Sequence, residues 1–204
     1  AVKQHFYDSG KKLYAETPAK KAYSQHSNIF AILADTEPQE NQQALMERVL
    51  TDSDLVQTSI YFNFYFFRAL KKAGLAHLYM DNLEDWYTML DYGYTSCGER
   101  AEPNNERSDC HAWSATPCFD YMNILLGIDS SKPGFQKVEI KPEFAKLDKL
   151  KGSFPHPDGD IKIDLKKSGE NITGSVHLPS GLDGEFYWKN KTMKIIGGEN
   201  QIEL

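Results

Sequence analysis

A polar segment between two apolar stretches carries most of the side chains whose types and spacing could do chemistry. It runs from Gly93 to Ala115 and holds clustered carboxylates, an imidazole and an indole: Glu99, Glu102, Glu106, Asp109, His111 and Trp113. Neighbouring carboxylates raise one another's pKa, which suits acid–base catalysis, and loops on a rigid scaffold often carry such groups. An aromatic ring beside an imidazole is a suitable platform for a sugar ring. The alternative is a loop that is charged only because it is solvated, with His111 and Trp113 packing at a helix start.

A second polar patch, Tyr23–Asn28, precedes an apolar stretch and includes His26. Ser24 is suited to cap the helix that follows, because its side chain can accept a hydrogen bond from a free backbone N–H of the first turn. The patch therefore predicts a capped helix start, with His26 either held by its neighbours or available to a ligand.

The motifs of several other chemistries are missing. Cys97, Cys110 and Cys118 form no CxxC pair, so at most one disulfide is expected and a zinc site is disfavoured. Cys110 and His111 are sequence neighbours, which seldom form a nucleophile–base pair. No phosphate-binding glycine loop and no HExxH motif occurs, and the acidic loop lacks the ligand spacing of a calcium loop. The sequence therefore predicts no metal and no cofactor.

Composition excludes two classes of partner. The 204 residues carry a formal net charge of −6, so a nucleic-acid-binding role has no electrostatic support. No apolar run approaches the roughly 20 residues of a membrane-spanning helix, and the first residues lack a signal-peptide core. A mildly acidic, aromatic-rich protein that binds a small or sugar-like ligand remains.

Hydrophobic spacing is helical up to about residue 130. Thr36 is expected to cap the second helix and Gly74 to end the third. The third helix is apolar on more than one face across Phe62–Phe67, and few helices are available to cover it. We therefore expect a larger helical assembly, or a partner surface, that this chain only partly contains. The five predicted helices cover about residues 24–34, 36–49, 59–73, 75–92 and 111–127.

After Lys132-Pro133-Gly134 the spacing changes to a period of two, with turn signals between short runs. This pattern predicts six or seven antiparallel strands, most simply a small β-sandwich. No linker separates the helical part from the sheet part. The sequence therefore predicts two packed domains, 1–130 and 131–204.

Five segments occur in a distinctive order along the chain. They are YSQHSN (Tyr23–Asn28), IYFNFYFFRALKKAG (Ile60–Gly74), the stretch from Trp86 to Glu99, SDCHAWSATP (Ser108–Pro117) and PGFQKVEIKP (Pro133–Pro142). Together they resemble the C-terminal part of bacterial α-L-rhamnosidases of glycoside hydrolase family 78. Each segment alone is weak, but the ordered set is specific and spans nearly the whole chain.

The resemblance implies a multidomain α and β fold: about five helices of an (α/α)6 barrel that carries the active site, then a C-terminal antiparallel β-sandwich. It also implies hydrolysis of terminal α-L-rhamnosides with inversion, by an acid on the leaving oxygen and a carboxylate base on water. By motif position, Glu99 corresponds to the general base and His111 to the histidine that contacts the sugar near it. Trp113 and His26 are the other predicted substrate-binding residues.

In that family the general acid lies in the first half of the barrel, so it is expected outside this chain, and the chain alone is expected to be inactive. The family often has tryptophan just before its catalytic glutamate, where this chain has Gly98. An inverting glycosidase of similar barrel fold for another sugar is therefore an alternative, and a sugar-binding or structural module without chemistry is a further one. The whole protein is expected to be exported, and the uncovered helical face predicts self-association.

Overall fold

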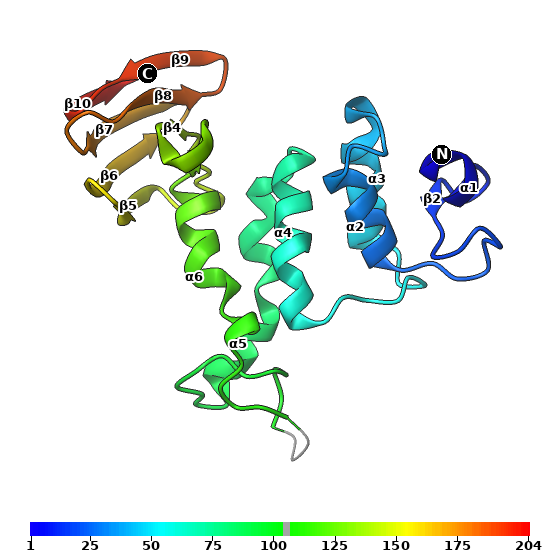
Figure 1. Cartoon of the computed structure of the whole chain (residues 1–204). Coiled ribbons are helices and arrows are strands. Elements are labelled where there is room, and N and C mark those ends of the chain that lie inside the picture. The colour runs from blue at the N-terminus through cyan, green and yellow to red at the C-terminus, as the bar shows by residue number, and fades with distance from the viewer. Residues whose placement is uncertain (104–106) are drawn as a thin grey trace. The chain divides into compact units, whose positions relative to one another are not determined.

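The computed structural model describes residues 1–103 and 107–204 (Figure 1). Glu106, one of the acidic residues of the polar segment, lies outside the described residues. The chain divides into two compact units, Ala1–Thr116 and Pro117–Leu204. The domain boundary predicted after residue 130 stays a prediction. Among the described residues, no helix is both long enough and apolar enough to cross a membrane.

The first unit is built mainly from helices, and α2 packs against both α3 and α4. Its core includes Ile29, Ile32, Met46 and Leu70, all of which are fully buried. In chain order its elements are α1 (Val2–Phe6), β1 (Tyr7–Asp8), β2 (Leu13–Tyr14), α2 (Gln25–Leu33), α3 (Gln39–Thr51), η1 (Ile60–Phe62), α4 (Asn63–Lys72), η2 (Ala76–Asn82), α5 (Glu84–Asp91) and η3 (Ala112–Ser114), followed by α6 (Thr116–Asp120), which crosses into the second unit.

Two of the predicted helix ends are confirmed and one is wrong. The Ser24 hydroxyl accepts a hydrogen bond from the backbone N–H of Ser27 at 3.3 Å, so Ser24 caps α2. Gly74 follows α4 with φ +79°, the left-handed conformation that glycine adopts readily. Thr36 does not cap α3, which begins at Gln39. The reason is that the Thr36 N–H donates to the Ala31 carbonyl at 2.9 Å, and so belongs to the turn that closes α2.

The fourth predicted helix is divided into a 3₁₀ segment, η2, and the α-helix α5. The side-chain amide of Asn82 donates to the Leu78 carbonyl at 2.9 Å. An α-helix would give that carbonyl to the backbone N–H of Asn82, so the side chain competes with helical pairing at this point. The fifth predicted helix is similarly broken into η3, α6 and the π-helical η4 (Tyr121–Leu125).

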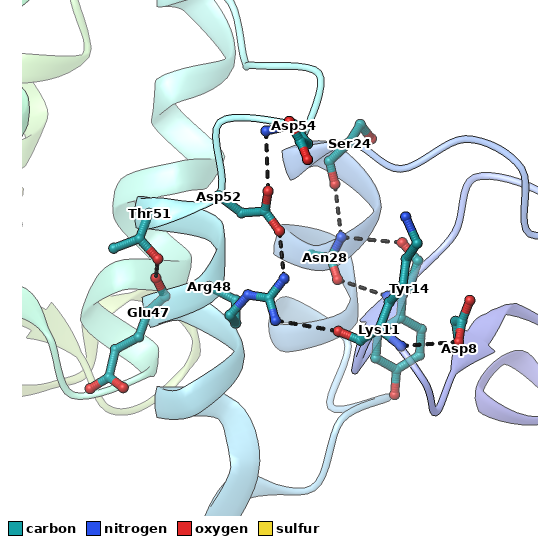
Figure 2. Close-up of polar contacts among 10 residues, drawn as sticks. All are labelled: Asp8, Lys11, Tyr14, Ser24, Asn28, Glu47, Arg48, Thr51, Asp52 and Asp54. Carbon is teal, nitrogen blue, oxygen red and sulfur yellow. Dashed lines mark hydrogen bonds and ion pairs between the residues drawn. The ribbon is translucent and has the colours of Figure 1, made fainter.

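Polar side chains tie the opening hairpin to the start of α2 (Figure 2). Buried Asn28 accepts a hydrogen bond from the Tyr14 N–H at 2.8 Å and donates to the Ser24 carbonyl at 2.8 Å. On α3, Arg48 donates to Asp52 at 2.5 Å and to the Lys11 carbonyl at 3.5 Å. The Asn28 bonds fix the first turn of α2, which carries His26, and the Arg48 bonds join α3 to the hairpin.

The second unit contains two four-stranded sheets, with strand orders β10-β7-β6-β5 and β3-β4-β8-β9. Every neighbouring pair is antiparallel except β4 with β8, which is parallel. In chain order the strands are β3 (Ile128–Ser130), β4 (Lys137–Ile140), β5 (Lys149–His156), β6 (Gly159–Ser168), β7 (Asn171–Leu178), β8 (Asp183–Trp188), β9 (Lys191–Ile195) and β10 (Gly198–Glu203), with the short 3₁₀ turn η5 (Pro133–Phe135) between β3 and β4.

The predicted class, helices followed by β-sheets, is confirmed, whereas the predicted strand details are partly wrong. The predicted number is confirmed, because seven strands, β4 to β10, follow Lys132 in this wholly described part of the chain, while β3 precedes it. The prediction that every pair is antiparallel is wrong, because β4 and β8 are parallel. A parallel pair needs a crossover connection, and β5, β6 and β7 of the other sheet supply it between β4 and β8. The alternation predicted in the strands is confirmed by burial: Ile161, Ile163 and Leu165 are buried, while Lys162 and Lys166 are exposed.

Candidate functional site

In the loop after α5, the segment that carries Glu99 pairs through backbone hydrogen bonds with the segment that carries His111. The Glu99 N–H donates to the Ser108 carbonyl at 2.9 Å, and the His111 N–H donates to the Cys97 carbonyl at 2.7 Å. Two pieces of chain separated by about ten residues therefore run side by side, much like the strands of a hairpin. This arrangement joins two of the residues that the sequence singles out.

The carboxylate of Glu99 is exposed and held at one end. Its Oε2 accepts a hydrogen bond from the Ser108 N–H at 3.0 Å. Glu99 lines a hollow of about 790 Å³ in the first unit. The walls of this hollow come from the segment before α4, from η2 and α5, and from the start of the loop, including Gln57, Ile60, Asn63, Asp81, Asp85, Thr88 and Glu102.

Asp85 is one of the other carboxyls that line this hollow, and its pKa is raised. Burial raises the pKa of Asp85, and the neighbouring charge of Glu84 raises it further. A carboxyl that holds its proton more tightly than usual suits acid–base chemistry. Sequence reasoning missed Asp85, because its burial depends on how α5 packs. The signal in the sequence is the pair of adjacent acidic residues, Glu84 and Asp85, in the first turn of α5.

A second hollow, of about 370 Å³, lies between the N-terminal half of α4 and η3. It is lined by Tyr61, Phe64, Tyr65, Ala112, Trp113, Ala115 and Thr116. Trp113 is 71% exposed, and its ring centroid lies 5.6 Å from that of Tyr61 and 6.3 Å from that of His111. The structure thus brings His111 and Trp113 together, and adds Tyr61, which sequence reasoning treated only as part of an apolar helix.

His26 lies in a separate aromatic cluster. Its ring centroid is 4.2 Å from that of Phe62, which in turn contacts Phe30 and Tyr65 at 5.5 and 5.0 Å. Glu99 and Trp113 line different hollows, and His26 is in the lining of neither. Through Phe62, the His26 cluster reaches Tyr65, which lines the same hollow as Trp113.

Gln25 attaches the segment before α4 to the start of α2, and sequence reasoning missed it. This buried side chain donates to the Val49 carbonyl at 2.9 Å and accepts from the Thr58 N–H at 2.8 Å. The Thr58 hydroxyl also donates to Gln25, at 3.1 Å. A buried amide with both ends satisfied fixes the wall of the larger hollow.

No group of three or more His, Cys, Asp or Glu side chains in residues 1–103 and 107–204 is arranged to hold a metal ion. None of the three cysteines, all within those ranges, forms a disulfide, and Cys110 and Cys118 are exposed. The chemistry that this arrangement offers is therefore that of carboxylates and an imidazole beside exposed aromatic rings.

Comparisons with known proteins give one family. Residues 127–203 match the bacterial alpha-L-rhamnosidase C-terminal domain. An alpha-L-rhamnosidase of Alteromonas sp. (strain LOR) is 27% identical over 119 residues, which are 53% of this chain and 13% of that protein.

Two solved structures share the fold across both units. The GH78 family rhamnosidase of Bacillus sp. GL1 has a TM-score of 0.80 and 24% identity, over 93% of this chain and 22% of that one. The Streptomyces avermitilis alpha-L-rhamnosidase complexed with L-rhamnose has a TM-score of 0.78 and 13% identity, over 99% of this chain and 23% of that one.

This chain therefore spans less than a quarter of the length of each of these relatives. The rhamnosidase resemblance of the five sequence segments is confirmed by the domain match, the sequence relative and the shared fold. The chain is therefore similar to the C-terminal part of α-L-rhamnosidases of glycoside hydrolase family 78, and its residues 127–203 match the bacterial alpha-L-rhamnosidase C-terminal domain.

Proposed function

We propose that the chain is the C-terminal part of an inverting α-L-rhamnosidase, to which it contributes helices of an (α/α)6 barrel, the general base and the C-terminal β-sandwich. The names of its relatives support the activity, and the L-rhamnose held by one of them supports the sugar. The general acid is contributed by residues outside these 204, so the chain alone is inactive.

The observation that carries this proposal is the setting of Glu99. A general base needs a carboxylate that is fixed in place yet open to water and substrate. Glu99 meets both conditions, because its Oε2 is held by the Ser108 N–H at 3.0 Å and its side chain faces an open hollow. The remaining oxygen, Oε1, is then the atom that takes the proton from the attacking water.

In the proposed reaction, that water attacks the anomeric carbon from the face opposite the leaving oxygen. The acid protonates the leaving oxygen as the glycosidic bond breaks, and the product emerges with inverted configuration. Inversion requires the two carboxyl groups to be about 6.5–9.5 Å apart, so that the water fits between base and sugar.

His111 and Trp113 are proposed to bind the sugar beside the base. A 6-deoxy sugar such as rhamnose presents a methyl group and an apolar ring face, which pack well against aromatic rings. Trp113 and Tyr61 supply exposed rings 5.6 Å apart, and the His111 backbone is tied to the loop of Glu99. His26 is proposed to contact substrate from the cluster around Phe62.

The test is hydrolysis of an aryl α-L-rhamnoside by the full-length protein and its Glu99→Gln variant. We expect kcat to fall by about 10²–10⁴-fold, because a positioned base contributes about that factor. The unfolding temperature should not change. Glu47→Gln is the matched control, because Glu47 is exposed on α3 and its carboxylate accepts a hydrogen bond from Gln43 of the same helix.

Two further observations complete the test. Proton NMR of the first product formed should show the inverted anomer. Full activity of Glu99→Gln would remove Glu99 as the base. Turnover by the 204-residue chain alone, lost in Glu99→Gln, would show instead that the chain supplies its own acid.

A glycosidase of similar barrel fold for another sugar is the second candidate, and the packing at Gly98 favours it. A Cβ added to Gly98 would lie 2.9 Å from Cε1 of Tyr94 and 3.1 Å from the Arg100 carbonyl oxygen. A tryptophan therefore does not fit there unless Tyr94 moves, so the surface next to Glu99 differs from that of the family. Assays with a panel of aryl glycosides distinguish the two candidates, because a preference for another sugar would reject rhamnose.

A further inference from the structure

Arg107 is the most deeply buried charged side chain among the described residues of the loop that carries Glu99. Its side chain is only 10% exposed. Its Nε donates to the Asp109 carboxylate at 2.6 Å, and its Nη1 donates to the Glu102 carbonyl at 2.9 Å. A buried guanidinium is costly unless it is paired in this way, so its partners hold it in one place.

The guanidinium also lies over an aromatic ring that is anchored to the helical scaffold. The guanidinium carbon of Arg107 is 4.6 Å from the centroid of Tyr94. The Tyr94 N–H donates to the Met89 carbonyl at 3.0 Å, which ties this residue to the end of α5. Arg107 therefore connects the loop to a rigid helix through a cation–π contact.

The same ring packs against the backbone just before Glu99. An added Cβ at Gly98 would approach Tyr94 to 2.9 Å, so the ring lies directly against the chain at that point. Glycine is required here by lack of space, because a larger residue would displace the ring. Tyr94 thus contacts Arg107 and also supports the residue that precedes the proposed base.

Arg107 is also next in sequence to Ser108, the residue that forms hydrogen bonds with Glu99. The next residue, Ser108, donates its N–H to Glu99 Oε2 at 3.0 Å and accepts from the Glu99 N–H at 2.9 Å. A shift of Arg107 would move Ser108, and with it both hydrogen bonds of Glu99.

We propose that Arg107 is a positioning residue for Glu99, acting with Tyr94, Glu102 and Asp109 as a clamp that sets the orientation of the Glu99 carboxylate. The inference rests on the proposed function, because the clamp matters for catalysis only if Glu99 is the base. It needs arginine in particular, since a planar guanidinium donates to two acceptors while it stacks on a ring, which a lysine ammonium does not do.

The first experiment is independent of activity. Amide hydrogen exchange is measured residue by residue in the 204-residue chain and in Arg107→Met, which keeps an unbranched side chain but removes the charge. We expect the Glu99 and Ser108 amides to exchange at least about tenfold faster, because their local opening becomes easier. Core amides such as those of Ile32 and Leu70 should be unchanged.

Two variants make this exchange experiment specific. Arg48→Met is the matched control, because it removes another arginine–aspartate pair, at 2.5 Å on α3, and should leave both loop amides unchanged. Arg107→Lys should behave like Arg107→Met, since charge alone does not restore the clamp. Unchanged exchange of Glu99 and Ser108 in Arg107→Met would overturn the proposal.

The second experiment uses the full-length protein and an aryl α-L-rhamnoside. Arg107→Ala should lower kcat by about 10–100-fold, because a small displacement of a catalytic group is costly. KM should stay within about twofold, since ground-state binding is not the affected step. Millimolar guanidinium should restore part of kcat, as it refills the vacated position.

Each other outcome has a definite meaning. A rise in KM with unchanged kcat would make Arg107 a direct sugar contact, and a loss of kcat without rescue by guanidinium would make it merely structural; both overturn the proposal. If Glu99→Gln keeps full activity, the proposed function fails, whereas the exchange experiment still decides whether the clamp exists.

Discussion

The two units of the chain differ in how completely they cover their own apolar side chains. In the first unit, seven of the described aromatic side chains are between 38% and 71% exposed. Two of them are Tyr87 and Tyr92, and we call the other five the aromatic face: Phe30, Tyr61, Phe64, Tyr65 and Trp113. In the second unit, most apolar residues of the strands are buried and the others are half-buried. Its exposed large apolar side chains are Phe119 and Tyr121, before the first strand, and Ile196, just after β9. Phe186 in β8 and Phe64 in α4 show the contrast, at 0% and 38% exposed.

The difference follows from geometry. Apolar residues of a strand alternate, so one face of each sheet collects them all, and two such faces cover one another. Apolar residues that follow one another in a helix point in several directions, and each direction needs its own neighbour. The sheets of the second unit therefore bury most of each other's apolar side chains. The helical unit instead leaves an aromatic face exposed, which suits packing against further helices or against a sugar.

The largest expected effect comes from truncating the same residue type in each unit. Phe186→Ala should lower the free energy of unfolding of the second unit by about 3–5 kcal/mol, because a buried phenyl ring leaves a cavity. Phe64→Ala should change that of the first unit by less than about 0.5 kcal/mol. Chemical denaturation followed by circular dichroism measures both. A large loss in Phe64→Ala would mean that the aromatic face is already covered in the chain.

The next effect concerns acid sensitivity in the first unit. Glu37 is 3% exposed, and this burial raises the pKa of its carboxyl. Hydrogen bonds from Tyr14 at 2.6 Å and from Lys3 and Asn41 outweigh burial, so the pKa of Glu37 lies below its ordinary 4.5. Glu37 therefore contributes stability at neutral pH that is lost as the pH falls through its lowered pKa.

Replacing Glu37 by Gln should cost the first unit about 1–3 kcal/mol near neutral pH, since hydrogen bonds to a charged group are lost. In this variant, the free energy of unfolding of the first unit should also fall less steeply as the pH is lowered. The second unit offers the comparison: the Lys137 ammonium lowers the pKa of Asp183, but that pair is exposed, so Asp183→Asn should have little effect. Unfolding temperatures measured from pH 3 to 7 show both behaviours, and an equal acid response in the two variants would contradict this contrast.

The smallest effect is weak association through the aromatic face. We expect the 204-residue chain to self-associate with increasing concentration, because an exposed apolar patch is buried when two copies meet. Phe30→Ser combined with Phe64→Ser should keep it monomeric. Ile196→Ser is the control, since it removes an exposed apolar side chain from the second unit. Sedimentation velocity over a wide concentration range measures this, and a chain that stays monomeric throughout would refute the prediction.

Much of the fold could be predicted because its signals are local. The change from helical spacing to alternation, the Ser24 cap and the Gly74 stop depend on neighbouring residues. The errors occur where a distant or competing partner decides the outcome. Asn82 interrupts the fourth helix with its own side chain, Thr36 closes the preceding helix, and β8 lies parallel to β4 across a crossover.

The candidate site was predictable in residue type but not in assembly. Glu99, His111 and Trp113 stand out because reactive and aromatic residues gather in one polar segment. Tyr61 and Gln25 do not, because an aromatic residue in an apolar helix and a glutamine at a helix start have many ordinary uses. Their contribution comes from contacts with residues more than thirty positions away.

The sequence alone therefore determined the order of the elements, the family likeness and the residues able to do chemistry, since periodicity and motifs are carried by neighbouring positions. Only the tertiary structure decided that Ser108 holds the Glu99 carboxylate, that Tyr94 occupies the space beside Gly98, and that buried Arg107 joins them. The physical reason is that hydrogen bonds and close packing depend on distances in space, and residues brought together by folding show no shared pattern along the chain.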